Sequence, residues 1–462
     1  MEFEQVKELL LSDVAKGLNL LNAKKKTDVL THKKEYAGGR TIRQSQVGNR
    51  LDKSVGKGAD AKTVVVAKIP INYQQKIVRS ATSFLFGSPI ELLSENEPAL
   101  TIIKNVWDSN RMDSKLKQAC EMVKSETEAV LFFFEEIEMN DEGKEVPVLK
   151  IRLYGSDNGT YAPYFDSYGD MKAFTWNFSS SDENGKEVLN AWVFTATETM
   201  KFSKLEAGWT LVDSKANLYG KIPIVYLSQD LPDWHIVKEL IDQNEMTFSK
   251  FTDTNSYFAA PIAKIFGKVT SMPDKNEAGK SINIPQTVDT TGKIVQGDVQ
   301  YLTWEQAPEA IRLENEISKD HIYGLTDTPD LSFNNVKGIG VTSGTALRFM
   351  FMGAINKAKF SETEYIIAIE RIISLIKAGT SKITDLSSAN TLKNSPIQIK
   401  FTSILPDNLA EIITTLSEAV GGKPIMSQET AVKNNPWVEN TTLELEAMKK
   451  EELQAMGESV EI

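Results

Sequence analysis

This chain of 462 residues has little of what metal and redox centres usually require. It contains one cysteine, Cys120, and three histidines, His32, His235 and His321, which lie far apart in the sequence. A single thiol excludes an intrachain disulfide framework and a cysteine-ligated zinc site, and scattered imidazoles do not predict a histidine-rich site. A Mg²⁺ or Ca²⁺ site made only of carboxylates stays open. No cofactor is predicted.

Long apolar runs are also absent. No stretch of 18 apolar residues occurs, so no membrane-spanning helix is predicted. The N-terminus, MEFEQVKELLLSDVAKGLNLL, is amphipathic and acidic from its second residue, whereas a secretory signal starts with basic residues before a continuous apolar core. We therefore expect a protein that is made and kept in a cytoplasm.

An overall excess of positive charge is the third absence. The net charge of −11 argues against general adhesion to nucleic acid. Residues 24–68 nevertheless hold twelve lysines or arginines against four acids, a net +8, which leaves −19 for the rest of the chain. Two interpretations stay open for this basic segment: a solvated arm, or a segment that docks onto an acidic neighbour such as another copy of the chain.

Motifs for catalysis are missing as well. The letters AGKS at residues 278–281 end like a phosphate-binding loop, but that motif requires glycine at position 274, which is Asp274. Glu126 and Glu128 would share one face of a strand if this region were extended, as paired acid–base carboxylates must. No convincing nucleophile accompanies them, so the sequence does not predict an enzyme.

What the sequence does contain is a regular change of pattern along the chain. Residues 1–22 predict one amphipathic helix, and residues 72–86 predict another, which Gly87 ends. Between residues 131 and 227, short aromatic or β-branched runs alternate with the turn sequences NDEG, SDNG and DENG. Asx-Gly turns join neighbouring strands, so an antiparallel sheet or a partly closed barrel is predicted there.

Two long helices are predicted on either side of a small strand-rich insert. Asp233 fits as the cap of the first helix, whose length of about 28 residues spans about 42 Å. Pro308 lies near the first turn of the second helix. The following stretch, GIGVTSGTALRFMFMGAINKA, is rich in glycine and then runs into an apolar helix that extends to about Lys377. This pattern predicts a mobile loop anchored on a rigid helix.

Six motifs in a fixed order resemble the portal proteins of tailed bacteriophages, in the branch typical of siphoviruses. The resemblance covers residues 36 to 452. The motifs are YAGGRTIRQ, KIPINYQQKIVRSATSFLFGSPIEL, NLYGKIPIVYL, IVKELIDQNEMTFSKFTD, TDTPDLSFNNVKGIGVTSGTALRFMF, and IKFTSILPDNLAEIITTL with the downstream GGKPIMSQETAVKNNPWVENTTLELE. Each motif alone is weakly specific, and their common order carries the resemblance.

The resemblance implies an α+β, non-enzymatic portal subunit. Carried over by position, its parts are a wing at 1–232, stem helices at 233–260 and 307–330, a clip at 261–306, a tunnel loop at 331–343, a long wing helix at 344–395, and a wing strand with a helical crown at 396–462. If the two stem helices line a channel, their surplus of acidic residues would keep DNA off its wall.

The resemblance also implies binding sites. The expected DNA contacts are Asn334, Asn335, Lys337, Thr342 and Arg348, with loop hinges at Gly338, Gly340 and Gly344. The expected docking residues for the motor and connector in the clip are Lys268, Lys275 and Lys280. No catalytic or metal-binding residue is implied.

The implied assembly is a homo-oligomeric ring, usually twelve-fold in the family, that conducts double-stranded DNA independently of its sequence. Its partners would be the terminase large subunit, the head-completion or connector proteins, and the major capsid and scaffold proteins. No membrane is involved, and the ring would be assembled in the bacterial cytoplasm and end in the virion.

Two other interpretations stay open. Another phage ring, such as a connector or baseplate protein, would lack two helices around an insert followed by a glycine-rich loop. A sheet-based hydrolase or sugar-binding enzyme would need a convergent polar site.

Overall fold

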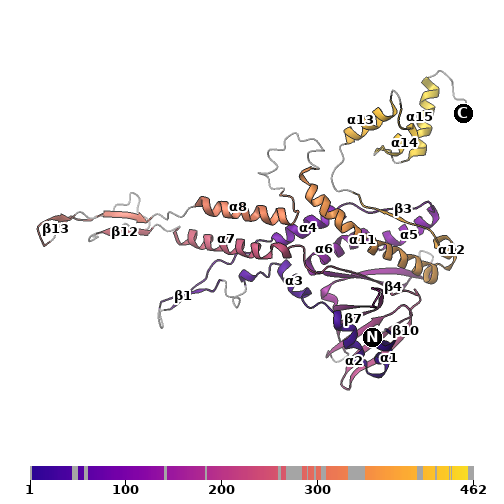
Figure 1. The fold of residues 1–462 in the computed structure, drawn as a ribbon, viewed down its shortest axis with the longest axis horizontal. Coiled ribbons are helices and arrows are strands. Elements are labelled where there is room, and N and C mark those ends of the chain that lie inside the picture. The colour runs from indigo at the N-terminus through magenta and orange to yellow at the C-terminus, as the bar shows by residue number, and fades with distance from the viewer. Residues whose placement is uncertain are drawn as a thin grey trace.

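The computed structural model describes residues 3–43, 50–56, 61–139, 143–182, 185–258, 262–266, 284–288, 290–295, 298–302, 308–330, 349–402, 409–421, 424–435, 437–438 and 440–455. It confirms the α+β class. The molecule is elongated: a body of helices and sheets lies at one end, and a pair of helices with a hairpin projects from it (Figure 1). In this described part, no helix is both long and apolar enough to cross a bilayer.

The N-terminal helix is divided in two, which corrects the prediction of one helix over residues 1–22. Helix α1 (Phe3–Ser12) and helix α2 (Val14–Leu21) meet at Asp13, whose carboxylate accepts a hydrogen bond from the backbone N–H of Lys16. This bond satisfies a free donor in the first turn of α2, so Asp13 starts a new helix instead of continuing the first. The apolar faces of both helices pack on the larger sheet.

The strands between residues 128 and 228 are antiparallel, as predicted, but they form two sheets instead of one sheet or barrel. The larger sheet has the order β10-β9-β8-β7-β6 and the smaller the order β11-β4-β5. The strands are β4 (Glu128–Met139), β5 (Glu145–Tyr154), β6 (Thr160–Phe165), β7 (Met171–Ser181), β8 (Glu187–Phe194), β9 (Glu198–Leu205), β10 (Gly208–Ala216) and β11 (Ile224–Ser228). Phe132, Tyr161 and Phe174 form part of an aromatic cluster that joins the two sheets.

Four helices of the body surround one large apolar core. They are α4 (Tyr73–Phe86), α5 (Glu97–Ser109), α6 (Met112–Glu126) and α11 (Met352–Gly379). Helix α3 (Val29–Tyr36) packs beside α6. Helix α4 ends at Gly87, as predicted. Helix α11 buries Ile369, Ile372 and Ile376 against this core, so the long helix predicted after the glycine-rich stretch is central to the body. Strand β3 (Glu91–Leu93) pairs with β16 (Gln398–Lys400).

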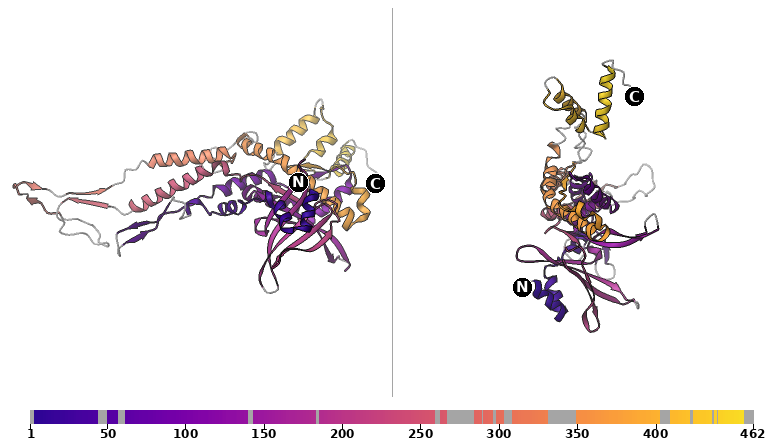
Figure 2. Two further views of the ribbon diagram at one scale, coloured as in Figure 1. Left: turned by 60° about the horizontal axis from the view of Figure 1, so that its bottom comes forward. Right: turned by 90° about the vertical axis from the view of Figure 1, so that its right-hand side faces the viewer.

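The projecting part consists of α7 (Lys238–Phe258) and α8 (Pro308–Leu325), which lie side by side (Figure 1, Figure 2). Beyond them, β12 (Ile262–Phe266) pairs with β15 (Asp298–Leu302), and β13 (Thr287–Val288) pairs with β14 (Ile294–Val295). The insert between the two helices is thus strand-rich over its described residues, as predicted.

The chain ends in a short helix α12 (Ala389–Leu392), strand β16 and three helices, α13 (Leu409–Val420), α14 (Gln428–Lys433) and α15 (Thr441–Ala455). The sequence predicts helix starts at Ser427 and Asn440, and both side chains accept hydrogen bonds from backbone N–H groups of the following turn. The third predicted start, at residues 406–407, lies outside the described residues.

Candidate functional site

The residues predicted from the resemblance to act on DNA or on partners lie outside the described part of the chain. They are Asn334, Asn335, Lys337, Gly338, Gly340, Thr342, Gly344 and Arg348 in segment 331–348, and Lys268, Lys275 and Lys280 in the insert. Their roles stay predictions. The structure does describe the residues that hold both ends of segment 331–348, and these define the candidate site.

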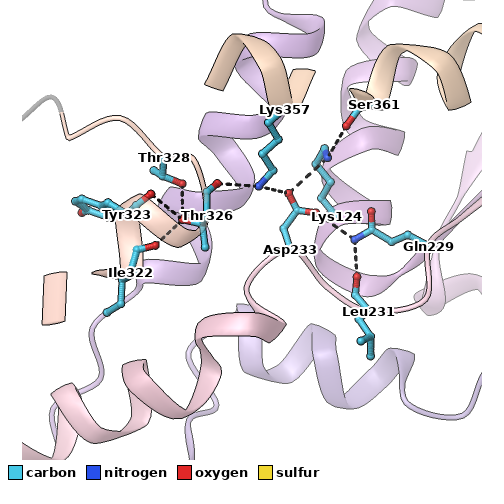
Figure 3. A network of polar contacts seen from close by, with 10 residues as sticks. All are labelled: Lys124, Gln229, Leu231, Asp233, Ile322, Tyr323, Thr326, Thr328, Lys357 and Ser361. Carbon is cyan, nitrogen blue, oxygen red and sulfur yellow. Dashed lines mark hydrogen bonds and ion pairs between the residues drawn. The ribbon is translucent and has the colours of Figure 1, made fainter. Parts of the chain in front are cut away.

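Asp233 is the centre of a buried charge network at the base of the helix pair (Figure 3). Its carboxylate lies 3.0 Å from Lys357 Nζ on α11 and 3.5 Å from Lys124 Nζ on α6, and it accepts a hydrogen bond of 3.2 Å from Gln229 Nε2. The side chains of Lys124 and Asp233 are only 5% and 8% exposed. Three segments far apart in the sequence are therefore joined by one carboxylate.

The role predicted for Asp233, a helix cap, is wrong. A 3-10 turn at His235–Val237 separates it from α7, and its carboxylate faces Lys124 and Lys357. Burial alone would favour the neutral acid, but the two ammonium groups and the bond from Gln229 outweigh this effect and hold the pKa of Asp233 below its ordinary value. Asp233 is thus a charged cross-link.

Lys357 also binds the C-terminal end of α8. Its ammonium donates a 3.1 Å hydrogen bond to the carbonyl oxygen of Thr326, and the hydroxyl of Thr326 donates to the carbonyl of Ile322 at 2.7 Å. The last carbonyl groups of a helix have no partner within the helix and carry partial negative charge, so a cation there is stabilising. Lys357 thereby holds α8 and the Asp233 loop to α11.

Both ends of segment 331–348 are attached to this junction. On one side, Asp330 forms an ion pair of 2.5 Å with Lys319 on α8, and this hydrogen bond raises the pKa of Lys319. On the other side, the ring of Phe351 packs against Phe84 on α4, with 5.7 Å between ring centroids. The first turn of α11 approaches the residues that follow α8, since a Cβ on Gly353 would lie 2.7 Å from the Asp327 carboxylate.

The basic segment packs along α7 at Arg40, at Arg50 and over residues 67–71, whereas its residues 51–54 and 61–65 are exposed, so only part of it is a solvated arm. Arg40 and Glu245 form an ion pair of 3.4 Å in which both side chains are fully buried, and Arg50 pairs with Asp253. Lys33 lies 3.3 Å from Glu126. The segment therefore docks on acidic groups, as one interpretation expected, but they belong to its own chain.

Backbone groups strengthen this docking. Three alternate N–H groups donate to three α7 side chains spaced by four residues: Ala67 to Asp253 at 2.7 Å, Ile69 to Ser249 at 3.0 Å and Ile71 to Glu245 at 2.8 Å. The acceptors span about 12 Å along the helix, and the four steps from residue 67 to 71 reach about 13 Å when extended. The two spacings match, so the segment runs antiparallel to α7.

This packing changes the expected charge of the helix pair. Part of the acidic surplus of α7 is neutralised by the basic segment, whereas the acids of α8 remain exposed and two of them, Glu309 and Glu316, share one partner, Arg312. The exposed acids of α8 are Glu309, Glu314, Glu316 and Asp320. A negative surface that could face DNA therefore belongs mainly to α8.

The helix pair has an apolar groove on one side and an apolar row on the other. The groove, of about 510 Å³, lies between α7 and α8 and is lined by Phe248, Phe251 and Ile311, among others. On α8, Leu313 and Ile317 are 56% and 46% exposed. Leu313 lies two residues after Ile311, which lines the groove, and two residues correspond to about 200° around the helix. The exposed pair and the groove therefore lie on nearly opposite sides of α8.

The possible carboxylate pair at Glu126 and Glu128 does not have the geometry of an acid–base site. Glu126 ends helix α6 and Glu128 begins strand β4, with Thr127 between them in the left-handed conformation (φ 76°). Glu126 accepts from Ser156 Oγ at 2.6 Å, and Glu128 accepts from the Tyr226 hydroxyl at 2.8 Å. Among the described residues, no group of three His, Cys, Asp or Glu side chains could hold a metal ion.

Comparison with known proteins identifies one family. Residues 18–458 match the family model described as "Phage portal protein, SPP1 Gp6-like". The chain is also similar to the portal protein of Bacillus phage SPP1, with 22% identity over 396 residues, which cover 82% of this chain and 75% of the relative.

Proposed function

Since the chain belongs to the SPP1 Gp6-like family of phage portal proteins, we propose that its helix pair and segment 331–348 form the DNA-conducting part of a portal ring. Family membership makes the chain a structural component of the phage head and a ring-forming protein, and it disfavours both the hydrolase and the baseplate interpretations. The proposal concerns which parts of this chain conduct DNA, dock partners and touch neighbouring copies.

The observation that carries this proposal is the junction around Asp233. Lys357, Asp233 and Lys124 join α11, the base of α7 and α6, and Lys357 also binds the end of α8. A loop that follows moving DNA needs a base that does not move with it. Both ends of segment 331–348 leave from this one cross-linked base, so the segment fits the role of the tunnel loop.

The charge distribution supports passage of DNA without tight binding. Lys337 is the one positive charge in the sequence between Asp330 and Arg348, and α8 exposes several acids. Like charge on α8 would repel the phosphate backbone, while a single lysine per loop would touch it weakly. We therefore assign Asn334, Asn335, Lys337, Thr342 and Arg348 to DNA contact.

Hinges of the loop are assigned to its three glycines, Gly338, Gly340 and Gly344. The remaining parts follow the order of the chain. We assign β12–β15 and the residues around them to the clip, where the terminase large subunit and then the head-completion or connector protein would dock, with Lys268, Lys275 and Lys280 as contacts.

The last sixty or so residues would form the crown inside the head, and the wing would meet the capsid and scaffold proteins. Assembly would take place in the bacterial cytoplasm, with twelve copies in each ring.

The first test is the native mass of the purified protein, measured together with averaged particle images. A closed ring of about a dozen chains with a central hole is expected from the family assignment. A stable monomer that does not assemble even with its scaffold protein would contradict ring formation by this chain.

The second test separates DNA contact from assembly. Lys337→Ala is expected to lower DNA packaging or retention while ring mass is unchanged, because it removes a positive charge that we assign to contact with the phosphates. Lys104→Ala, at an exposed position of α5 in the body and outside the proposed channel, is the matched control and should package as the unaltered ring does. Equal packaging by both variants would remove the role assigned to Lys337.

A further inference from the structure

A pocket in the body, at the C-terminal end of α11, concentrates positive charge in a chain that is acidic overall. The pocket has a volume of about 510 Å³. Its charged lining residues are Lys221, Lys377, Lys382, Lys393 and one acid, Glu370, a net +3. For comparison, the whole chain has a net charge of −11.

The lysines of this pocket are held by neutral groups. Lys221 Nζ donates to Ser374 Oγ at 2.5 Å, Lys377 Nζ to the carbonyl of Ser395 at 2.5 Å, and Lys382 Nζ to the carbonyl of Tyr219 at 2.8 Å. Where the chain is described, no ion pair joins any of the four lysines to a carboxylate. The positive charge is therefore positioned by the fold but not neutralised by it.

The ammonium groups also affect one another. Burial, followed by the nearby charges of Arg371 and Lys382, lowers the pKa of Lys221, and burial followed by Lys221 lowers the pKa of Lys377. Like charges at close range destabilise the protonated forms, so an anion between them would relieve this repulsion. A negatively charged ligand would therefore bind favourably in this pocket.

The floor of the pocket decides which kind of anion fits. Ile373, Leu392 and Ile397 line it together with the lysines. A phosphate group has no apolar atoms to place against this floor, and a DNA duplex, whose major groove alone is about 12 Å wide, is too wide to enter a pocket of this size. A peptide with both carboxylates and aliphatic side chains fits this lining, because its carboxylates can pair with the lysines at the rim and its aliphatic side chains can pack on the apolar floor.

We propose that this pocket binds an acidic peptide segment of another phage-head protein, with carboxylates on the lysine rim and an aliphatic side chain on the floor. Helix α12 and this end of α11 lie at the end of the molecule opposite the β12–β15 hairpin (Figure 1). The 28 residues of α11 place this pocket about 40 Å from the start of that helix, where segment 331–348 ends. The inference rests on the proposed function, which puts segment 331–348 at the DNA channel and leaves this pocket to the capsid shell or its scaffold.

The test is a fluorescence-anisotropy titration of the full-length protein with a labelled peptide of alternating Glu-Leu-Glu-Glu units at low salt. Binding should weaken as salt is added, because exposed charges are screened. The double variant Lys221→Gln/Lys393→Gln should bind about tenfold more weakly, as expected for the loss of two partly exposed ion pairs. The matched control is Lys104→Gln/Lys117→Gln, two exposed lysines on α5 and α6, and it should bind within about twofold of the unaltered protein.

Two further ligands separate the alternatives. A peptide with serine in place of every leucine should bind clearly more weakly. Neither inorganic phosphate nor a 20-base-pair duplex should displace the original peptide when each is added at the same concentration of negative charge as the peptide. The proposal is overturned by absence of peptide binding, by equal loss in both double variants, by no effect of the serine peptide, or by displacement by the duplex. Because the assay needs neither a ring nor packaging, its failure and a failure of the portal assignments give different results.

Discussion

Replacing Asp233 by asparagine should destabilise the body strongly, because Asp233 supplies the negative charge between Lys124 and Lys357. Removing one partner of a buried ion pair costs about 3–5 kcal/mol. Lys124 is 5% exposed and cannot reach water, whereas Lys357 is 22% exposed and can partly do so. Asparagine keeps the shape and the dipole, so we expect the lower end of this range, about 3 kcal/mol.

The free energy of unfolding can be measured by urea titration of the dispersed subunit, followed by tryptophan fluorescence and by circular dichroism. Trp234 is fully buried beside Asp233 and stacks on Tyr36, so one of the seven tryptophans that give the fluorescence signal lies at this junction. A double-mutant cycle with Lys124→Met isolates the pair. The coupling energy should be about 2–3 kcal/mol, since residues of one buried network are not additive. Additive effects, or a loss under about 1 kcal/mol for Asp233→Asn, would refute this account of the junction.

The same pair predicts a pH dependence. The pKa of Asp233 is lowered in the folded protein, so its contribution is fully present above the unfolded pKa of about 4 and is lost as the pH falls through the lower folded value. The stability difference between the unaltered protein and Asp233→Asn should therefore be constant from about pH 5 to pH 8 and shrink below about pH 4. A difference that grows toward acid pH would have the wrong sign.

Three more predictions test other parts of the molecule. We expect Leu313 and Ile317 of one copy to pack in the apolar groove between α7 and α8 of the next copy in the ring. Aspartate at both positions should therefore abolish ring assembly while the circular dichroism stays that of the folded subunit. Methionine at both positions is the control, and intact rings from the aspartate variant would contradict this packing. Gly340→Pro should block DNA packaging without changing ring mass, and normal packaging would remove the requirement for a hinge there. Ser249→Ala removes the acceptor for the N–H of Ile69 and should lower the free energy of unfolding in urea by about 1 kcal/mol; no change would mean that water replaces this bond.

The sequence predicts those elements whose limits are set locally. Gly87 ends α4, and Ser427 starts α14, because each acts within one turn of its own helix. The division of the strands into two sheets could not be predicted in this way. It depends on β11 returning to pair with β4, about a hundred residues earlier in the chain, and no local pattern encodes that pairing.

The junction was missed for a similar reason. Lys124, Asp233 and Lys357 are each more than a hundred residues apart, so spacing could not connect them. One local signal was present: Leu116, Cys120 and Lys124 follow one another at four-residue intervals on α6, and all three are buried. A lysine within a buried apolar row requires a counter-charge, and a search among the acids for its partner could have led to Asp233.

The docking of residues 67–71 on α7 has a consequence for how this region can change in evolution. Its donors are main-chain amides, which every residue except proline possesses, so side chains at positions 67, 69 and 71 can be exchanged with little effect on these bonds. The number of residues in this stretch is constrained, however. Inserting or deleting one residue would move every later amide N–H away from its acceptor on α7. Apart from Ile71, which also lines the groove between α7 and α8, these positions should therefore accumulate substitutions while the residue count stays fixed.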